Sequence, residues 1–219
     1  LVGDSLANVL YGFNSTHKID LNTMINHGKS VMLGIKKSLC VIDMPKNTYR
    51  NNKEALKNAK YIISQTRCDA VKIENYKNNS SIIKHLVKSG IDVMGHIGYT
   101  PQFKGKFRPS GLTTLEKNKL INDAKKIENA GAFSIVLECV EKNISKKITN
   151  QLNIPTIGIG SSVNCDGQIL VTDDIIGLSG FYPKFIKKYV DVKKIIEKAT
   201  KKYRSDVIKK KFPSQKNSY

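Results

Sequence analysis

Ala70-Val-Lys-Ile-Glu74 is the stretch of sequence that decides the fold. The β-branched residues Val71 and Ile73 favour a short strand. Successive strand side chains point to opposite faces, so Lys72 and Glu74 share one face. Three other strand-like runs also pass from apolar residues to a carboxylate, at Asp4, Asp43 and Glu138. This repetition predicts that the carboxyl ends of several strands meet at one polar site.

Short apolar runs alternate with amphipathic helices along most of the chain. Strands are predicted over residues 2–4, 39–44, 70–74, 91–98, 133–139, 154–161 and 168–171, and the last can include 175–176. Helices are predicted over residues 20–36, 53–66, 80–88, 113–130 and 191–203, with a further lysine-rich helix that ends near 152. Asp20 is expected to cap the first helix, and Gly90 to follow the end of the third.

This alternation is typical of a parallel sheet built from right-handed βα units. Seven predicted strands are one fewer than a (β/α)₈ barrel has, and the chain opens inside an element. We therefore expect an α/β fold, a TIM (β/α)₈ barrel whose first βα unit lies upstream of Leu1. A doubly wound open sheet is the alternative, but no GxGxxG motif follows the first strand. The barrel domain is expected over residues 1–205 and a basic tail over 206–219.

The composition gives little support for a nucleic-acid or membrane partner. The net charge is +19, but 33 of the 37 basic residues are lysines spread along the chain, without arginine clusters. No apolar run approaches the roughly 20 residues that span a membrane. Four cysteines lie far apart, which is typical of a reduced, cytosol-like compartment. We expect a cytoplasmic protein that binds neither nucleic acid nor membrane.

The polar residues at the strand ends point to metal-assisted chemistry. In a barrel, the carboxyl ends of the strands carry the active site. Six residues map there: Asp4, Asp43, Lys72, Glu74, His96 and Glu138. The carboxylates of Asp4, Asp43 and Glu74 are hard oxygen ligands that suit Mg²⁺. Any one of the six could equally be an ordinary strand-end residue that faces a loop.

Each of the remaining strand-end groups also has two interpretations. Lys72 can neutralise a substrate carboxylate, or form a structural ion pair with Glu74 or Asp43. Glu138 can serve as a general base, or pair with Lys72 or His96. His96 is either near a ligand or a satisfied structural histidine. Together the residues favour a Mg²⁺-assisted lyase or transferase acting on a small oxo acid.

An ordered set of motifs resembles the ketopantoate hydroxymethyltransferase family. The matching stretches are Leu1-Val-Gly-Asp-Ser-Leu6, Asp43-Met-Pro45, Val71-Lys-Ile-Glu74, Gly95-His-Ile-Gly-Tyr-Thr-Pro-Gln102, Leu137-Glu-Cys-Val140, Ile154-Pro-Thr-Ile-Gly-Ile-Gly160, Asp166-Gly-Gln-Ile-Leu-Val171 and Pro183-Lys-Phe185. Each stretch is weak by itself, whereas their common order is specific.

The resemblance implies a (β/α)₈ barrel that uses Mg²⁺ and takes its one-carbon unit from 5,10-methylenetetrahydrofolate. By position, Asp4, Asp43 and Glu74 match the family's metal ligands. Its oxo-acid contacts match Asp4, Ser5, Asp43 and Lys72, and its proton acceptor matches Glu138. The implied reaction removes the C3 proton of 3-methyl-2-oxobutanoate to give a Mg²⁺-bound enolate. This enolate attacks the methylene carbon and yields 2-dehydropantoate and tetrahydrofolate, the first step of pantothenate biosynthesis.

The resemblance also implies a cytoplasmic homodecamer. This chain departs from the family pattern in three places. The family's first barrel strand, which precedes the equivalent of Leu1, is absent. The loop over residues 102–111 is shorter than the family's glycine-rich flap, and Ser161-Ser162 stands where Ala-Gly is common. An open barrel exposes strand edges, so residues 1–219 alone are expected to be poorly stable or inactive.

Two alternatives remain at this point. The phosphoenolpyruvate mutase/isocitrate lyase group also consists of barrels that bind Mg²⁺-chelated oxo acids. A truncated, non-catalytic basic binding protein is the second alternative. Against it, the chain retains site residues that match the family, namely Asp4, Asp43, Lys72, Glu74 and Glu138.

Overall fold

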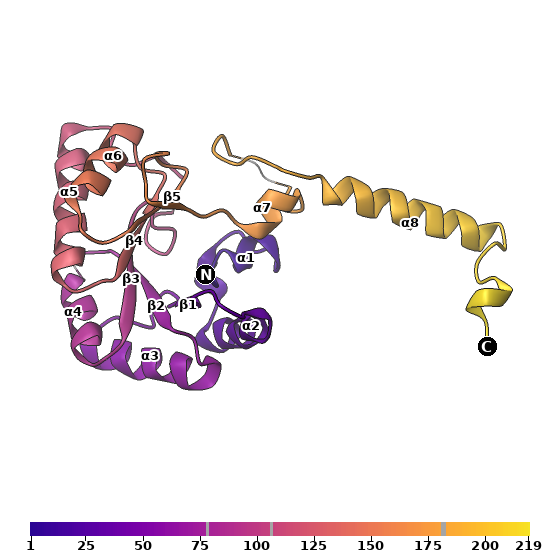
Figure 1. Ribbon diagram of the computed structural model, residues 1–219, viewed down its shortest axis with the longest axis horizontal. Helices are drawn as coiled ribbons and strands as arrows, with labels where there is room; N and C mark the ends of the chain where they lie inside the picture. The colour runs from indigo at the N-terminus through magenta and orange to yellow at the C-terminus, as the bar shows by residue number, and fades with distance from the viewer. Residues whose placement is uncertain (78, 106, 181–182) are drawn as a thin grey trace. The chain divides into compact units, whose positions relative to one another are not determined.

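The computed structural model describes residues 1–77, 79–105, 107–180 and 183–219 (Figure 1). The chain divides into two compact units, Leu1–Ile169 and Leu170–Tyr219, and each is described by itself. The predicted loop over residues 102–111 includes position 106, which lies outside the described residues. The expected single domain over 1–205 stays a prediction.

The first unit is built on one parallel sheet. Its six strands follow chain order: β1 (Val41–Asp43), β2 (Ala70–Glu74), β3 (Asp92–Gly98), β4 (Ser134–Glu138), β5 (Thr156–Ile159) and β6 (Gly167–Gln168). The main helices between and before them are α2 (Leu21–Gly34), α3 (Asn52–Thr66), α4 (Ser80–Lys88), α5 (Thr114–Asn129) and α6 (Lys142–Gln151). The sheet curls into a half-barrel, which confirms the predicted barrel-type α/β fold.

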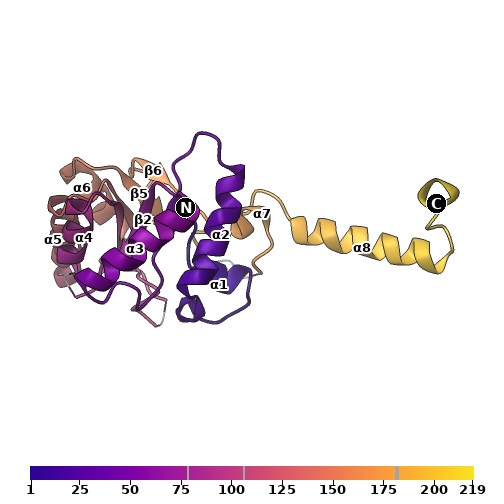
Figure 2. The same cartoon turned by 90° about the horizontal axis from the view of Figure 1, so that it is seen from below.

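The helices cover the outer face of the curled sheet, where α3, α4, α5 and α6 lie side by side in both views (Figures 1 and 2). Local sequence signals set their ends. Asp20 accepts a hydrogen bond from Thr23 N and caps α2 as predicted, and Thr113 with Glu116 forms a capping box at α5. Gly90 follows α4 with φ +78°, a left-handed conformation that favours glycine.

The structure has six of the seven predicted strands, because the predicted strand over residues 2–4 forms only an isolated bridge. Val2 makes a single parallel bridge with Ile42, in which Val2 N donates to Val41 O and Asp43 N donates to Val2 O. This short segment continues into a 4-residue helix, α1 (Leu6–Val9). The bridge nevertheless places Asp4 beside the end of β1.

The inclusion of residues 175–176 in the last strand is wrong. They belong to the helix α7 (Thr172–Ile176), while β6 covers only Gly167–Gln168. Asp173 and Asp174 lie in the first turn of α7, where acidic side chains interact favourably with the helix dipole. The paired isoleucines therefore close a short helix.

The inner face of the sheet changes character along the strands. Near the amino ends, the apolar side chains of Val41, Ala70, Met94 and Val136 pack together. Towards the carboxyl ends, the inner positions carry Asp43, Lys72, Glu74 and His96, all buried. All five residues of β2 are buried, so both faces of the strand lie in the interior.

The second unit contains α7, a long helix α8 (Val192–Ile208) and a single turn, η2 (Gln215–Asn217). None of the α8 residues is buried. The helix continues past the predicted end at 203 and past the expected start of the tail at 206. Within the described residues, no helix has both the length and the apolarity needed to cross a membrane.

Candidate active site

Strand register brings the predicted site residues together. Asp43 lies opposite Lys72 across β1 and β2, and Glu74 lies opposite His96 across β2 and β3. Glu138 ends β4, opposite Gly98 of β3. The carboxyl ends of four neighbouring segments therefore converge, as the repeated apolar-to-acidic pattern predicts.

Lys72 lies at the centre of a buried polar network. Its Nζ is 2.7 Å from Asp43 Oδ1 and makes a 3.3 Å hydrogen bond with His96 Nδ1. The Lys72 residue is 4% exposed and Glu74 is fully buried. The structural ion pair with Asp43 that the sequence left open is thus present.

His96 connects this network to Glu138. Its Nε2 lies 3.2 Å from Glu138 Oε2, without the alignment of a hydrogen bond, and its Nδ1 lies 3.7 Å from Glu74 Oε1. Burial and the neighbouring Lys72 charge lower the pKa of His96, which favours the neutral ring. The contacts assign the Nδ1 lone pair to Lys72 and the Nε2 proton to the Glu138 side.

Glu138 is the most accessible acid of the cluster, with its side chain 20% exposed. The turn after it is braced by Ser161, whose Oγ donates to Leu137 O and accepts from Val140 N. Ser161 therefore holds β4 and β5 together at the point where Glu138 leaves the sheet.

Asp4 and Ser5 come from the segment before α1. Asp4 N donates to Asp43 Oδ2 over 3.4 Å, so Asp4 belongs to the carboxylate cluster. Ser5 is partly exposed at the start of α1, and its side chain makes no capping hydrogen bond. Ser5 approaches the cluster only as the chain neighbour of Asp4.

Two site residues were not identified from the sequence, Gln102 and Tyr49. Gln102 Nε2 donates to Asp4 Oδ2 over 2.9 Å, and its backbone N donates to Glu74 Oε2 over 3.1 Å. Tyr49 Oη donates to Gln102 Oε1 over 2.5 Å. Gln102 ends the stretch Gly95–Gln102 that resembles the family, and this resemblance is its signal in the sequence. No local pattern marks Tyr49.

The cluster contains more acidic than basic side chains. Asp4, Asp43 and Glu74 surround the Lys72 ammonium. Burial raises the pKa of Asp43 to about 7, against the lowering effect of Lys72. Burial and the neighbouring acids also raise the pKa of Glu74 well above its usual value. Ionising several buried carboxyl groups together is energetically unfavourable, and a bound cation would offset that unfavourable free energy.

The donor set fits Mg²⁺ in its chemistry. Buried Glu74 Oε1 has no hydrogen-bond partner in the described part of the chain. In the described ranges, no three His, Cys, Asp or Glu side chains already converge as a ready metal shell. Mg²⁺ keeps several waters and needs few protein ligands, so these carboxylate oxygens suffice for a fit.

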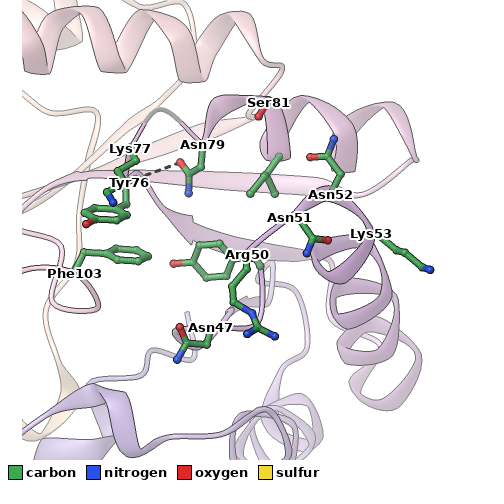
Figure 3. Close-up of a pocket in the computed structure, with 12 residues that line it drawn as sticks. Asn47, Arg50, Asn51, Asn52, Lys53, Tyr76, Lys77, Asn79, Ser81 and Phe103 are labelled. Atoms are coloured by element: carbon green, nitrogen blue, oxygen red, sulfur yellow. Dashed lines mark hydrogen bonds between the residues drawn. The ribbon is translucent and has the colours of Figure 1, made fainter.

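A cavity of about 740 Å³ lies beside the cluster, over the amino end of α3 (Figure 3). Tyr76 and Phe103 stack along one wall with ring centroids 4.2 Å apart. Tyr49 also lines this cavity and connects it to Gln102. A second cavity of about 640 Å³ lies between the end of β3 and α5. The acidic residues of the cluster do not line either cavity.

Buried acid, ammonium and imidazole groups at the carboxyl ends of curled parallel strands define an enzyme of the (β/α)-barrel class. Solved structures share this fold. Phosphonopyruvate hydrolase in complex with oxalate and Mg++ aligns with a TM-score of 0.56 at 11% identity, covering 98% of this chain and 79% of its own. 2,3-Dimethylmalate lyase, a PEP mutase/isocitrate lyase superfamily member, aligns with a TM-score of 0.52 at 12% identity, covering 72% and 56%.

The chain belongs to the ketopantoate hydroxymethyltransferase family, whose model matches residues 1–215. A 3-methyl-2-oxobutanoate hydroxymethyltransferase from Pelagibacter ubique (strain HTCC1062) is 55% identical over 219 residues, covering 100% of this chain and 85% of the relative. One from Bartonella tribocorum (strain CIP 105476 / IBS 506) is 46% identical over 223 residues, covering 100% and 82%. The chain is therefore a transferase enzyme, and the suspected family is confirmed.

Proposed function

We propose that this enzyme transfers a hydroxymethyl group from 5,10-methylenetetrahydrofolate to 3-methyl-2-oxobutanoate, forming 2-dehydropantoate in pantothenate biosynthesis. The carrying observation is the buried strand-end cluster, in which a lysine lies among three carboxylates in a chain 55% identical to a relative of that name. The reaction needs a group for the oxo-acid carboxylate, an electrophile for its keto oxygen and a base for its C3 proton.

Lys72 binds the carboxylate of the oxo acid in this proposal. Burial alone would lower its pKa, but Asp43, Glu74 and Asp4 raise it, so the ammonium stays charged. When the substrate binds, its carboxylate replaces part of the contact between Lys72 and Asp43. Ser5 lies next to Asp4 at the same edge of the site.

Asp4, Asp43 and Glu74 would hold Mg²⁺. When bound, the ion polarises the keto oxygen and so acidifies the neighbouring carbon. The fit rests on the hard oxygen donors, the excess of acidic over basic side chains, and Glu74 Oε1, which has no hydrogen-bond partner among the described residues.

Glu138 takes the C3 proton. His96 Nε2 lies 3.2 Å from the Glu138 carboxylate, on the side of Lys72. The methylene carbon of the folate starts with two bonds to nitrogen, and both break. A bond to the enolate carbon replaces one of them, and a bond to the oxygen of water replaces the other. The two nitrogens take up the C3 proton and one proton of the water, so one oxo acid, one methylenetetrahydrofolate and one water give 2-dehydropantoate and tetrahydrofolate.

Exchange of the C3 proton of the oxo acid into D₂O, without folate, tests the role of Glu138. The test uses the product of the complete reading frame that contains residues 1–219. Glu138→Gln is expected to lower exchange at least about 100-fold, the usual scale of acid–base catalysis, while oxo-acid binding with Mg²⁺ remains. The matched control Glu141→Gln, at the cap of α6, keeps normal exchange. Unchanged exchange in Glu138→Gln would remove Glu138 from the role of base.

The family resemblance supports a cytoplasmic homo-oligomer, which we propose to be a decamer. Light scattering of the purified protein at several concentrations measures the mass directly. A monomer at all concentrations would contradict this part of the proposal.

A further inference from the structure

Both the nitrogen and the oxygen of the Gln102 side-chain amide form hydrogen bonds beside the carboxylate cluster, and the residue is fully buried. Its Nε2 donates to Asp4 Oδ2 over 2.9 Å and to Met44 O over 3.0 Å. Its Oε1 accepts from Tyr49 Oη, and its backbone N donates to Glu74 Oε2. The residue is fully buried, so its amide group is shielded from solvent.

These partners fix the orientation of the amide. A carbonyl oxygen and a carboxylate accept hydrogen bonds, so the group that faces Met44 and Asp4 must be the NH₂ group. The Tyr49 hydroxyl then donates to the amide oxygen on the other side. Reversing the amide would set its oxygen against Met44 O and the Asp4 carboxylate, which costs several hydrogen bonds at once.

The backbone of Gln102 is also anchored at the strand ends. Tyr99 N donates to Glu138 O, and Phe103 N donates to Thr100 O. The segment therefore leaves β3 in a tight turn that holds Gln102 over the ends of β1 and β2. Both its main chain and its side chain are held in place before any ligand arrives.

Gln102 binds two of the three candidate metal ligands, one oxygen of each. Asp4 Oδ2 and Glu74 Oε2 face Gln102, whereas Glu74 Oε1 has no hydrogen-bond partner among described residues. We propose that Gln102 is a positioning residue that orients Asp4 and Glu74 for a divalent cation, with Tyr49 orienting Gln102. This inference rests on the metal part of the proposed function.

Mg²⁺ affinity, measured by titration calorimetry without either substrate, tests the inference. Gln102→Leu keeps the side-chain volume but removes the amide contacts. The Mg²⁺ dissociation constant is expected to rise about 10- to 100-fold, as for other residues that orient metal ligands. Tyr49→Phe removes one donor and keeps the ring, so a smaller rise in the same direction is expected. Gln168→Leu makes the same chemical change on β6, where Nε2 donates to Ser162 O, and leaves the affinity unchanged.

A purely structural role for Gln102 would lower the melting temperature and leave ligand geometry unaltered. Mn²⁺ prefers the same oxygen ligands as Mg²⁺ and has an electron paramagnetic resonance spectrum that reports the symmetry of its shell. A changed Mn²⁺ spectrum in Gln102→Leu supports positioning, and an unchanged spectrum with unchanged affinity overturns it. If Gln102→Leu does not fold, unchanged affinity and spectrum in Tyr49→Phe overturn the inference. Wild-type protein that binds no Mg²⁺ would instead overturn the metal part of the proposed function, and this inference with it.

Discussion

Lys72 and the acids around it are subject to two opposing electrostatic effects: the unfavourable burial of charge and the favourable attraction between opposite charges. Burial of a charged group is unfavourable, and each of Lys72, Asp43 and Glu74 is almost fully buried. The 2.7 Å contact of Lys72 with Asp43 offsets part of that cost, but two further carboxylates share the same ammonium. The site is therefore arranged for an added cation and a bound anion, at the expense of stability when both are missing.

Replacing Lys72 with methionine should affect binding more than it affects chemistry at saturation. Lys72→Met removes the charge that holds the substrate carboxylate, so KM for the oxo acid should rise at least about 100-fold, corresponding to about 3 kcal/mol. The neighbouring Asp43 then loses its ion-pair partner. Protonation of the Asp43 carboxylate should offset part of the resulting loss of stability. Steady-state kinetics at fixed Mg²⁺ measure the effect. A normal KM would show that Lys72 is only a structural ion-pair partner.

The raised pKa of Asp43, about 7, predicts how stability depends on pH without metal. The folded state holds this proton more tightly than the unfolded chain, so the contribution is present at low pH and is lost as pH rises through about 7. The unfolding free energy should fall by about 1 kcal/mol between pH 6 and pH 8. Urea unfolding in chelator at the two pH values measures it, and Asp43→Asn should remove most of the difference. A rise in stability over this range would contradict the account.

At the scale of elements, periodicity and caps predicted most of the strands and helices. The bounds of β2 and α4 agree with the predicted ranges 70–74 and 80–88, because strong apolar runs and turn residues mark both ends. The convergence of Asp43, Lys72, Glu74 and Glu138 also followed, since parallel strands share one carboxyl edge. The positions of Gln102 and Tyr49 in the site could not be predicted in this way, because the direction of a loop side chain depends on segments far away in the chain.

Gly98 shows why the ends of β3 and β4 can lie so close. Its φ is +102°, and an added Cβ would lie 2.1 Å from Glu138 O and 2.7 Å from Val140 Cγ2. Gly98→Ala should cost at least about 2 kcal/mol of stability and displace Glu138. Gly34→Ala is the matched control, because nothing lies within 4 Å of that Cβ. Thermal unfolding and C3 exchange measure the two effects; equal behaviour of both variants would contradict the close packing of the strand ends.

At the scale of the whole molecule, the proposed function does not involve the net charge of +19. Among the described residues, the edges of the sheet are short: Val2 bridges β1 on one side, and β6 has two residues on the other. Short edge strands limit unwanted pairing. The expectation that residues 1–219 alone are poorly stable or inactive stays a prediction, and a cooperative melt with full activity would contradict it.

Transfer of a labelled carbon tests the proposed function most directly. The product of the complete reading frame is incubated with 3-methyl-2-oxobutanoate and 5,10-methylenetetrahydrofolate carrying ¹³C in the methylene group, with Mg²⁺ or with chelator. We expect 2-dehydropantoate labelled at its new hydroxymethyl carbon, formed with Mg²⁺ and not with chelator. Folded protein that binds the oxo acid but forms no labelled product, or that turns over phosphonopyruvate instead, would contradict it.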